Sequence, residues 1–105
     1  MPMLTDQLRH QIKNEIKKNK VVIYMKGDLF QPMCGFSSRA VQILQSYGVT
    51  IKDHNVLASE ELRQAIKEFT NWPTIPQIFI NGEFIGGADI IAQMHENGEL
   101  ASLLK

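Results

Sequence analysis

Apolar residues near the start of the chain recur at helical spacing and then become continuous. Threonine commonly caps helix N-termini, and Thr5 is a candidate cap. After Thr5, apolar residues recur every four positions and predict a helix that ends near Asn19. The apolar residues of this helix are Leu8, Ile12 and Ile16. Residues 21–25 form an unbroken apolar run, which is typical of a buried strand. The chain therefore begins with a helix that is followed by a strand.

The middle of the chain predicts a second helix, a second strand and a third helix. Residues 37–47 are expected to be helical, and Gly48 lies where a helix commonly ends on glycine. Residues 49–55 alternate weakly between apolar and polar and predict a strand. Ser59 is a good N-cap for the next helix. The apolar positions of these helices are Val41 and Leu44 in the first, and Leu62, Ile66 and Phe69 in the second.

The last third predicts a hairpin and two helices. Segments 77–80 and 83–85 read as strands on either side of Asn81-Gly82, a pair that strongly favours a type I′ turn. A helix is expected from about Ala88, and Asn97-Gly98 ends it before a short C-terminal helix. The apolar positions are Ile90, Ile91 and Met94 in the first helix, and Leu100, Leu103 and Leu104 in the second.

The order of these elements, α-β-α-β-α-β-β-α, predicts an α/β fold. The first two strands belong to a βαβ unit, which implies that they are parallel with a right-handed crossover. The last two strands form an antiparallel hairpin, so the sheet is mixed and four-stranded. Helices must cover both faces of such a small sheet. This is thioredoxin-like architecture.

Composition and charge narrow the class of protein. The 105 residues suit one domain over residues 1–105, with 44% hydrophobic and 21% charged residues. The formal net charge is zero, so nothing points to nucleic acid or an acidic membrane, and no apolar run approaches the ~20 residues of a membrane span. Residues 1–6 lack a signal-peptide layout. A single cysteine suits a reducing compartment, so we expect a bacterial cytoplasm, or an organelle matrix after removal of a targeting segment.

The single cysteine, Cys34, lies where a loop meets a predicted helix. One cysteine cannot close a disulfide within the chain, so any thiol chemistry needs a second thiol from elsewhere. Free cysteines are often small, inert core residues, which is one interpretation. The alternative is a reactive thiolate, because the N–H groups and dipole of a helix N-terminus stabilise negative charge. Lys26, just after the first strand, adds a positive charge nearby.

Two further segments have both a structural and a functional interpretation. In segment 72–76, a cis bond before Pro76 would let the backbone of Ile75 bind an extended, peptide-like ligand; otherwise the segment is a turn with Trp72 packed on the core. Segment 86–89 contains two glycines before a helix, whose exposed N–H groups suit a carboxylate. Asp89 then either caps the helix or accepts from a ligand ammonium. The sequence leaves both pairs of alternatives open.

Taken together, these motifs resemble those of the monothiol glutaredoxins of the CGFS type. The similarity extends from about Val21 to Leu100, with the order and spacing of the motifs preserved. It rests on five segments: Met25-Lys26-Gly27, Cys34-Gly35-Phe36-Ser37, residues 71–77, residues 82–90, and Gly98-Glu99-Leu100. The resemblance implies a thioredoxin fold, a glutathione site beside the cysteine, and a [2Fe–2S] cluster that bridges two subunits.

The resemblance also implies roles for individual residues. Cys34 corresponds to the cluster ligand and to the thiol that pairs with glutathione. Lys26 and Arg63 correspond to cations that face the glycine carboxylate of glutathione, and Ala88 and Asp89 to positions that hold its γ-glutamyl end. The remaining positions of the implied site are Gly35 and Phe36 beside the thiol, and Trp72, Thr74 and Gly87 along the groove. Ile75 corresponds to the residue whose backbone binds the cysteinyl part of glutathione, and the following Pro76 is expected to be cis.

Three functions follow from the resemblance and stay open. The first is a carrier of an iron–sulfur cluster, held as a homodimer, that works with BolA-like proteins and with iron–sulfur assembly and recipient proteins. The second is a glutathione-dependent thiol–disulfide oxidoreductase that uses Cys34 alone, because Ser37 stands where dithiol relatives have a second cysteine. The third is a pure adaptor. The stretch Asp28-Leu29-Phe30 departs from the proline that family loops often carry here, and Ile75 replaces a common phenylalanine.

Overall fold

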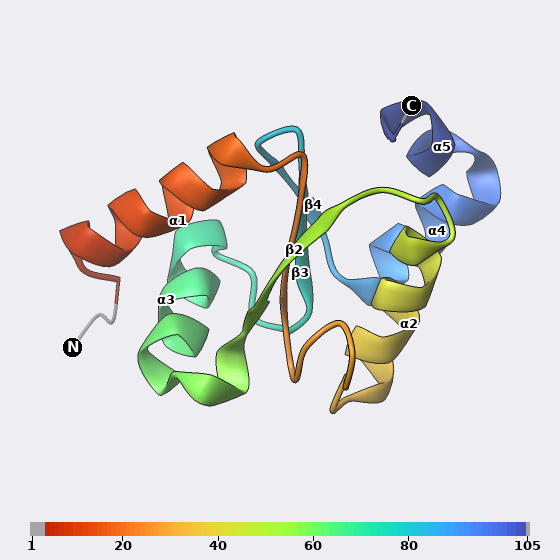
Figure 1. Cartoon of the computed structure of the whole chain (residues 1–105). Coiled ribbons are helices and arrows are strands. Elements are labelled where there is room, and N and C mark those ends of the chain that lie inside the picture. Colours follow the sequence, from red (N-terminus) through yellow and green to blue (C-terminus); the bar gives the residue numbers. More distant parts are fainter. Residues whose placement is uncertain (1–3, 105) are drawn as a thin grey trace.

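A four-stranded mixed sheet forms the centre of the protein (Figure 1). The computed structural model describes residues 4–104, so the expectation for residues 1–6 lies partly outside the described chain. The strands are β1 (Val21–Met25), β2 (Ile51–Asn55), β3 (Gln77–Ile80) and β4 (Glu83–Gly86), in the order β2-β1-β3-β4. β1 pairs parallel with β2, whereas β1 with β3 and β3 with β4 are antiparallel. The predicted mixed sheet is confirmed.

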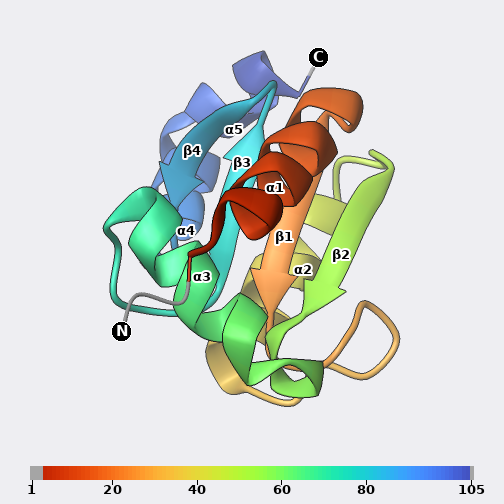
Figure 2. The same cartoon turned by 90° about the vertical axis from the view of Figure 1, so that its left-hand side faces the viewer.

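Helices cover both faces of this sheet (Figures 1 and 2). On one face lie α1 (Asp6–Lys18) and α3 (Glu60–Thr70), preceded by the short 3₁₀ turn η1 (Val56–Ala58). On the other face lie α2 (Gly35–Gln45), α4 (Ala88–Asn97) and α5 (Glu99–Leu103). The predicted thioredoxin fold is therefore confirmed. Within residues 4–104, none of these helices has the length and apolarity that crossing a membrane requires.

The central strand β1 contributes to both hydrophobic cores. Val21, Ile23 and Met25 pack with α2, α4 and α5, while Val22 and Tyr24 pack with α1 and α3. All five side chains are at most 1% exposed. Successive strand residues point to opposite faces, so a strand covered on both faces must be apolar throughout. This explains why residues 21–25 lack the alternation of a half-exposed strand.

Local signals predicted most element ends correctly. Thr5 and Ser59 cap α1 and α3 through their side chains, accepting from the N–H groups of Leu8 and Leu62. Asn81 and Gly82 have φ values of 54° and 82°, as the expected type I′ turn requires.

Two predicted boundaries shift. Helix α2 begins at Gly35 and ends at Gln45, earlier at both ends than predicted. Strand β2 begins at Ile51, because its pairing with β1 starts there, opposite Val21.

Candidate functional site

Cys34 is the N-cap residue of α2 and is half-buried. The backbone N–H of Ser37 has the largest effect on the pKa of its thiol and lowers it. Partial burial opposes this effect, while the N–H of Phe36 and the charge of Lys26 lower the pKa further. The thiolate is the form of cysteine that attacks disulfides and binds metals. Cys34 is thus neither fully buried nor part of the two hydrophobic cores, which contradicts the core interpretation, and the lowered pKa favours the thiolate.

Ser37 connects the first turn of α2 to the end of β1. Its side chain is completely buried, and its Oγ accepts a hydrogen bond of 3.1 Å from the backbone N–H of Lys26. The Ser37 N–H simultaneously acts on the Cys34 sulfur. A single buried residue thus fixes the thiol and the backbone of Lys26 relative to each other.

The loop between β1 and α2 is held by side chains of β2. The N–H of Gly27 donates to Asn55 Oδ1 at 3.0 Å, and the N–H of Leu29 donates to Asp53 Oδ2 at 3.0 Å. Inside the loop, Asp28 Oδ1 accepts from the N–H groups of Phe30 and Gln31 at 2.9 and 2.7 Å. The approach to Cys34 therefore has a defined backbone. Sequence reasoning missed Asp53 and Asn55, because nothing local connects a polar residue in β2 to this loop.

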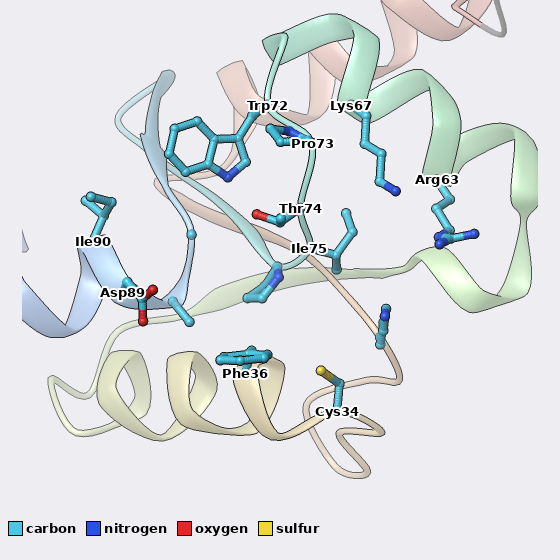
Figure 3. A pocket seen from close by; sticks show the side chains of 14 residues that line it. Cys34, Phe36, Arg63, Lys67, Trp72, Pro73, Thr74, Ile75, Asp89 and Ile90 are labelled. Atoms are coloured by element: carbon cyan, nitrogen blue, oxygen red, sulfur yellow. The ribbon is translucent and has the colours of Figure 1, made fainter.

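Cys34 lies on the wall of a cavity of about 460 Å³ that five separate segments line (Figure 3). Eleven of the residues that the resemblance implied line it: Lys26, Cys34, Phe36, Arg63, Trp72, Thr74, Ile75, Pro76, Gly87, Ala88 and Asp89. Gly35 does not line the cavity and lies exposed in the first turn of α2. The structure adds Lys67, Pro73 and Ile90 to the lining. The tertiary fold thus brings together positions that lie far apart in the sequence.

The cavity is electrostatically asymmetric. Figure 3 shows the side chains of Arg63 and Lys67, both from α3, on one side and Asp89 at the start of α4 on the other. Arg63 Nη1 lies 3.2 Å from Glu60 Oε2, whereas Arg63 Nε is buried without a hydrogen-bond partner. A buried donor without a partner costs free energy that a bound acceptor would recover. Lys67 follows Arg63 by four residues, a helical spacing that could have indicated it from the sequence.

Segment 72–76 forms the wall between these two sides, and its Ile75–Pro76 bond is cis. The segment is fixed by Gln77, which is completely buried and whose Nε2 donates to the carbonyl oxygens of Trp72 and Thr74 at 2.9 and 3.2 Å. Thr70 Oγ1 in turn donates to Gln77 Oε1 at 2.8 Å. Sequence reasoning did not identify this role of Gln77, which depends on contacts with the preceding turn and with the last residue of α3.

Ligand binding by the Ile75 backbone stays a prediction, whereas Trp72 has the packing contact that the turn interpretation expects. Its ring packs edge-on against Phe84, with 5.6 Å between ring centroids, and it also lines the cavity. Trp72 Nε1 is buried without a hydrogen-bond partner. Gly87 lies beside it, where a Cβ atom would come within 3.3 Å of the Pro76 carbonyl oxygen and 3.6 Å of Trp72 Nε1. A larger residue at position 87 would therefore crowd this end of the cavity.

Helix α4 presents an N-terminus to the cavity without a side-chain cap. Gly87 is the N-cap residue and makes no capping hydrogen bond, while Asp89 is exposed in the first turn. The alternative in which Asp89 caps the helix is therefore wrong, because the helix begins one residue before it. A helix N-terminus offers N–H donors to a carboxylate, and an adjacent aspartate can accept from an ammonium group. This end of the cavity is thus suited to an amino-acid-like group.

Comparisons with known proteins agree with one another. The Glutaredoxin family model matches residues 21–85. Monothiol glutaredoxin-S15, mitochondrial, from Arabidopsis thaliana is 55% identical over 99% of this chain, which spans 62% of that protein's length. Monothiol glutaredoxin-5, mitochondrial, from Schizosaccharomyces pombe is 50% identical over 98% of this chain and 73% of its own length. The solution structure of reduced poplar apo GrxS14 superposes with a TM-score of 0.84 at 42% identity, covering 97% of this chain and 93% of that one.

Proposed function

The chain belongs to the glutaredoxin family, with monothiol glutaredoxins as its relatives, and we propose that it binds glutathione and carries a [2Fe–2S] cluster between two subunits. The observation that carries this proposal is the thiol of Cys34, with its lowered pKa, on the wall of a cavity with cations at one end and an uncapped helix N-terminus at the other. In this proposal the cluster is cargo for iron–sulfur assembly and transfer. We assign residues 1–105 to a single glutaredoxin domain.

Glutathione matches the chemistry of the cavity along its length. Its glycine carboxylate pairs with Lys26, Arg63 and Lys67, where the buried Nε of Arg63 has an unused hydrogen to donate. Its γ-glutamyl end carries a carboxylate for the N–H groups of α4 and an ammonium for Asp89. The backbone of Ile75, next to cis-Pro76, lies between these ends and pairs with the cysteinyl part in the manner of an added strand.

The presence of only one cysteine per chain supports a shared cluster. A [2Fe–2S] cluster generally requires four ligands of thiolate type, and one chain supplies only Cys34. Two chains and two glutathione molecules supply four. Met33 and Phe36 beside Cys34 are 68% and 62% exposed, so the rim of the site is apolar and suits contact with a second copy. Two of the four ligands are not covalently held by the protein, which favours handing the cluster on.

The second candidate function is disulfide reduction, which the lowered pKa of Cys34 favours. The Cys34 thiolate attacks the glutathione sulfur of a protein–glutathione disulfide, the S–S bond breaks, and the target leaves as a thiolate. A second glutathione thiolate then attacks the Cys34-bound glutathione, which releases Cys34 and forms glutathione disulfide. Ser37 cannot replace the second glutathione, because a buried hydroxyl that accepts from Lys26 offers no thiolate.

The proposed partners and compartment follow from the carrier function. We expect BolA-like proteins and iron–sulfur assembly or recipient proteins to contact the apolar rim beside Cys34. A reducing compartment, either a bacterial cytoplasm or an organelle matrix, keeps the Cys34 thiol available. The adaptor function remains the third alternative, and binding of these partners without a cluster would favour it.

Anaerobic reconstitution with iron, sulfide and glutathione tests the carrier proposal. The expected product has a visible cluster absorption and elutes as a dimer, and Cys34→Ser abolishes both while circular dichroism stays unchanged. Glutathione ethyl ester, which lacks the free glycine carboxylate, should support less cluster than glutathione if the cations act as proposed. A cluster spectrum retained in Cys34→Ser contradicts the ligand assignment. A colourless monomer that reduces glutathione mixed disulfides supports the oxidoreductase.

A further inference from the structure

A second groove lies away from Cys34, between α1, α3 and the β3–β4 hairpin. It has a volume of about 590 Å³ and shares no lining residue with the cavity beside the thiol. Figures 1 and 2 show α1 and α3 side by side on the same face of the sheet, with the hairpin next to α1. The volume falls within the range that small-molecule sites in proteins commonly have. We call this feature the α1–α3 groove.

The floor of the α1–α3 groove is aromatic. Phe79 is 2% exposed at its base, and Phe69 and Phe84 are half-buried on either side. The ring centroid of Phe79 lies 6.3 Å from that of Phe69 and 5.4 Å from that of Phe84, both tilted. Aromatic rings attract a further ring in an offset or edge-on arrangement. The floor is thus suited to an aromatic body.

The rim of the groove is positively charged. Lys13 and Lys17 are one helical turn apart on α1, and both line the groove. None of the lining residues is an aspartate or glutamate. Among residues 4–104, the structure gives neither lysine an ion-pair partner. Two adjacent cations without an acidic partner favour an anionic group on whatever occupies the groove.

We propose that the α1–α3 groove is a second ligand site, which binds a small aromatic carboxylate. The aromatic body lies on Phe69, Phe79 and Phe84, and the carboxylate interacts with the ammonium groups of Lys13 and Lys17. The charge of the rim selects the anion, and the apolar floor excludes fully polar anions such as inorganic phosphate. This site is independent of the glutathione cavity, so it stands or fails separately from the proposed function.

Trp72 supplies a natural reporter for the groove. It is the only tryptophan of the chain, and its ring lies edge-on against Phe84 at 5.6 Å between centroids. A ligand that contacts Phe84 therefore changes the magnetic environment of the Trp72 indole. Because Trp72 also lines the cavity beside Cys34, its shift is assigned to the groove only when the amide signals of groove residues shift with it.

The test is a titration of the full ¹⁵N-labelled chain with naphthalene-1-carboxylate, followed by NMR, with naphthalene-1-carboxamide as the uncharged matched ligand. We expect the carboxylate to shift the amide signals of Thr70, Gly82 and Phe84 and the indole signal of Trp72. The variant Lys13→Gln/Lys17→Gln should raise the dissociation constant about tenfold, since each exposed ion pair contributes up to fivefold. The control Lys18→Gln/Lys52→Gln removes the same charge from exposed positions outside the groove and should leave the constant unchanged.

Three results would overturn the proposal. The first is equal binding of the carboxylate and the carboxamide, which would show that the lysines do not select an anion. The second is an equal effect of the two double variants, which would reduce the rim to general surface charge. The third is the absence of shifts in the groove, or shifts confined to residues around Cys34. Circular dichroism of each variant verifies that a lost signal is not a loss of folding.

Discussion

The backbone N–H of Lys26 donates to Ser37 Oγ at 3.1 Å, and this hydrogen bond joins the end of β1 to the first turn of α2. Ser37 is completely buried, so its hydroxyl has no water as an alternative partner. The same turn holds the Cys34 thiol through the N–H of Ser37. The relationship explains how a serine three residues after the thiol acts on the site without any thiol chemistry of its own.

Removing this hydroxyl should destabilise the protein. Ser37→Ala leaves the N–H of Lys26 without its acceptor, and an unsatisfied buried donor costs about 1–3 kcal/mol. Chemical denaturation measures the free energy of unfolding. The matched control is Ser38→Ala, whose hydroxyl accepts only a long, exposed hydrogen bond from Gln42 and should cost less than about 0.5 kcal/mol. Equal effects of the two substitutions would show that the Ser37 bond does not stabilise the fold.

The Cys34 thiol should ionise at lower pH in the folded protein than in the unfolded chain. The Ser37 N–H is the main cause of the lowered pKa, with help from the Phe36 N–H and Lys26. Rates of alkylation by iodoacetamide, measured against pH, should have a midpoint below the ~8.5 of free cysteine. Because the folded pKa is depressed, this ionisation stabilises the fold above the unfolded pKa, and the contribution disappears as pH falls through the folded one. The same midpoint in urea-unfolded protein would contradict this prediction.

The cations of the cavity should control how long a glutathione-dependent cluster is retained. Lys26→Gln and Lys67→Gln each remove a cation that the proposed function places at the glycine carboxylate, which is expected to speed cluster loss about fivefold, or ~1 kcal/mol for a half-exposed pair. Decay of the visible absorption under excess glutathione measures this rate. Lys18→Gln, an exposed lysine on α1, is the control for net charge. If a variant loses its cluster at the same rate as the control, the substituted lysine does not contribute to binding glutathione.

Acidification should destabilise the fold through His54. Burial is the main cause that lowers the pKa of His54. The charge of Lys52 lowers this pKa further, whereas the charges of Glu15 and Asp53 raise it. His54 Nε2 is buried without a partner, and the ring stacks on Tyr24 at 4.7 Å between centroids. His54 therefore binds a proton more tightly in the unfolded chain than in the folded protein. The free energy of unfolding falls as pH falls through the pKa of unfolded histidine, about 6.5, and levels off below the folded pKa.

His54→Phe keeps a stacking ring and removes the titration. Denaturation midpoints between pH 8 and pH 5 should therefore fall less in this variant than in the unsubstituted protein. His10→Phe, which changes an exposed histidine on α1, is the control and should retain the original pH dependence. Identical pH profiles for the unsubstituted protein and His54→Phe would exclude His54 as the source of the acid sensitivity.

The sequence by itself determined the elements and the place of the thiol, because these depend on neighbours in the chain. The caps at Thr5 and Ser59 and the turn at Asn81-Gly82 use side chains or φ angles that act within a few residues. The unbroken apolar run of β1 already indicated a buried strand. The placement of Cys34 before a helix followed from the same local signals.

Only the tertiary structure decided which side chains meet at the thiol and what holds them there. Lys67 enters the cavity because α3 packs with its basic face toward Cys34, and Gln77 fixes segment 72–76 by bonding to carbonyl groups of a turn. Asp53 and Asn55 hold a loop that lies more than 20 residues away in the sequence. These hydrogen bonds require β2 to lie beside β1, which is a pairing between segments that are distant in the sequence. Their strength comes from burial and distance, which the order of residues does not specify.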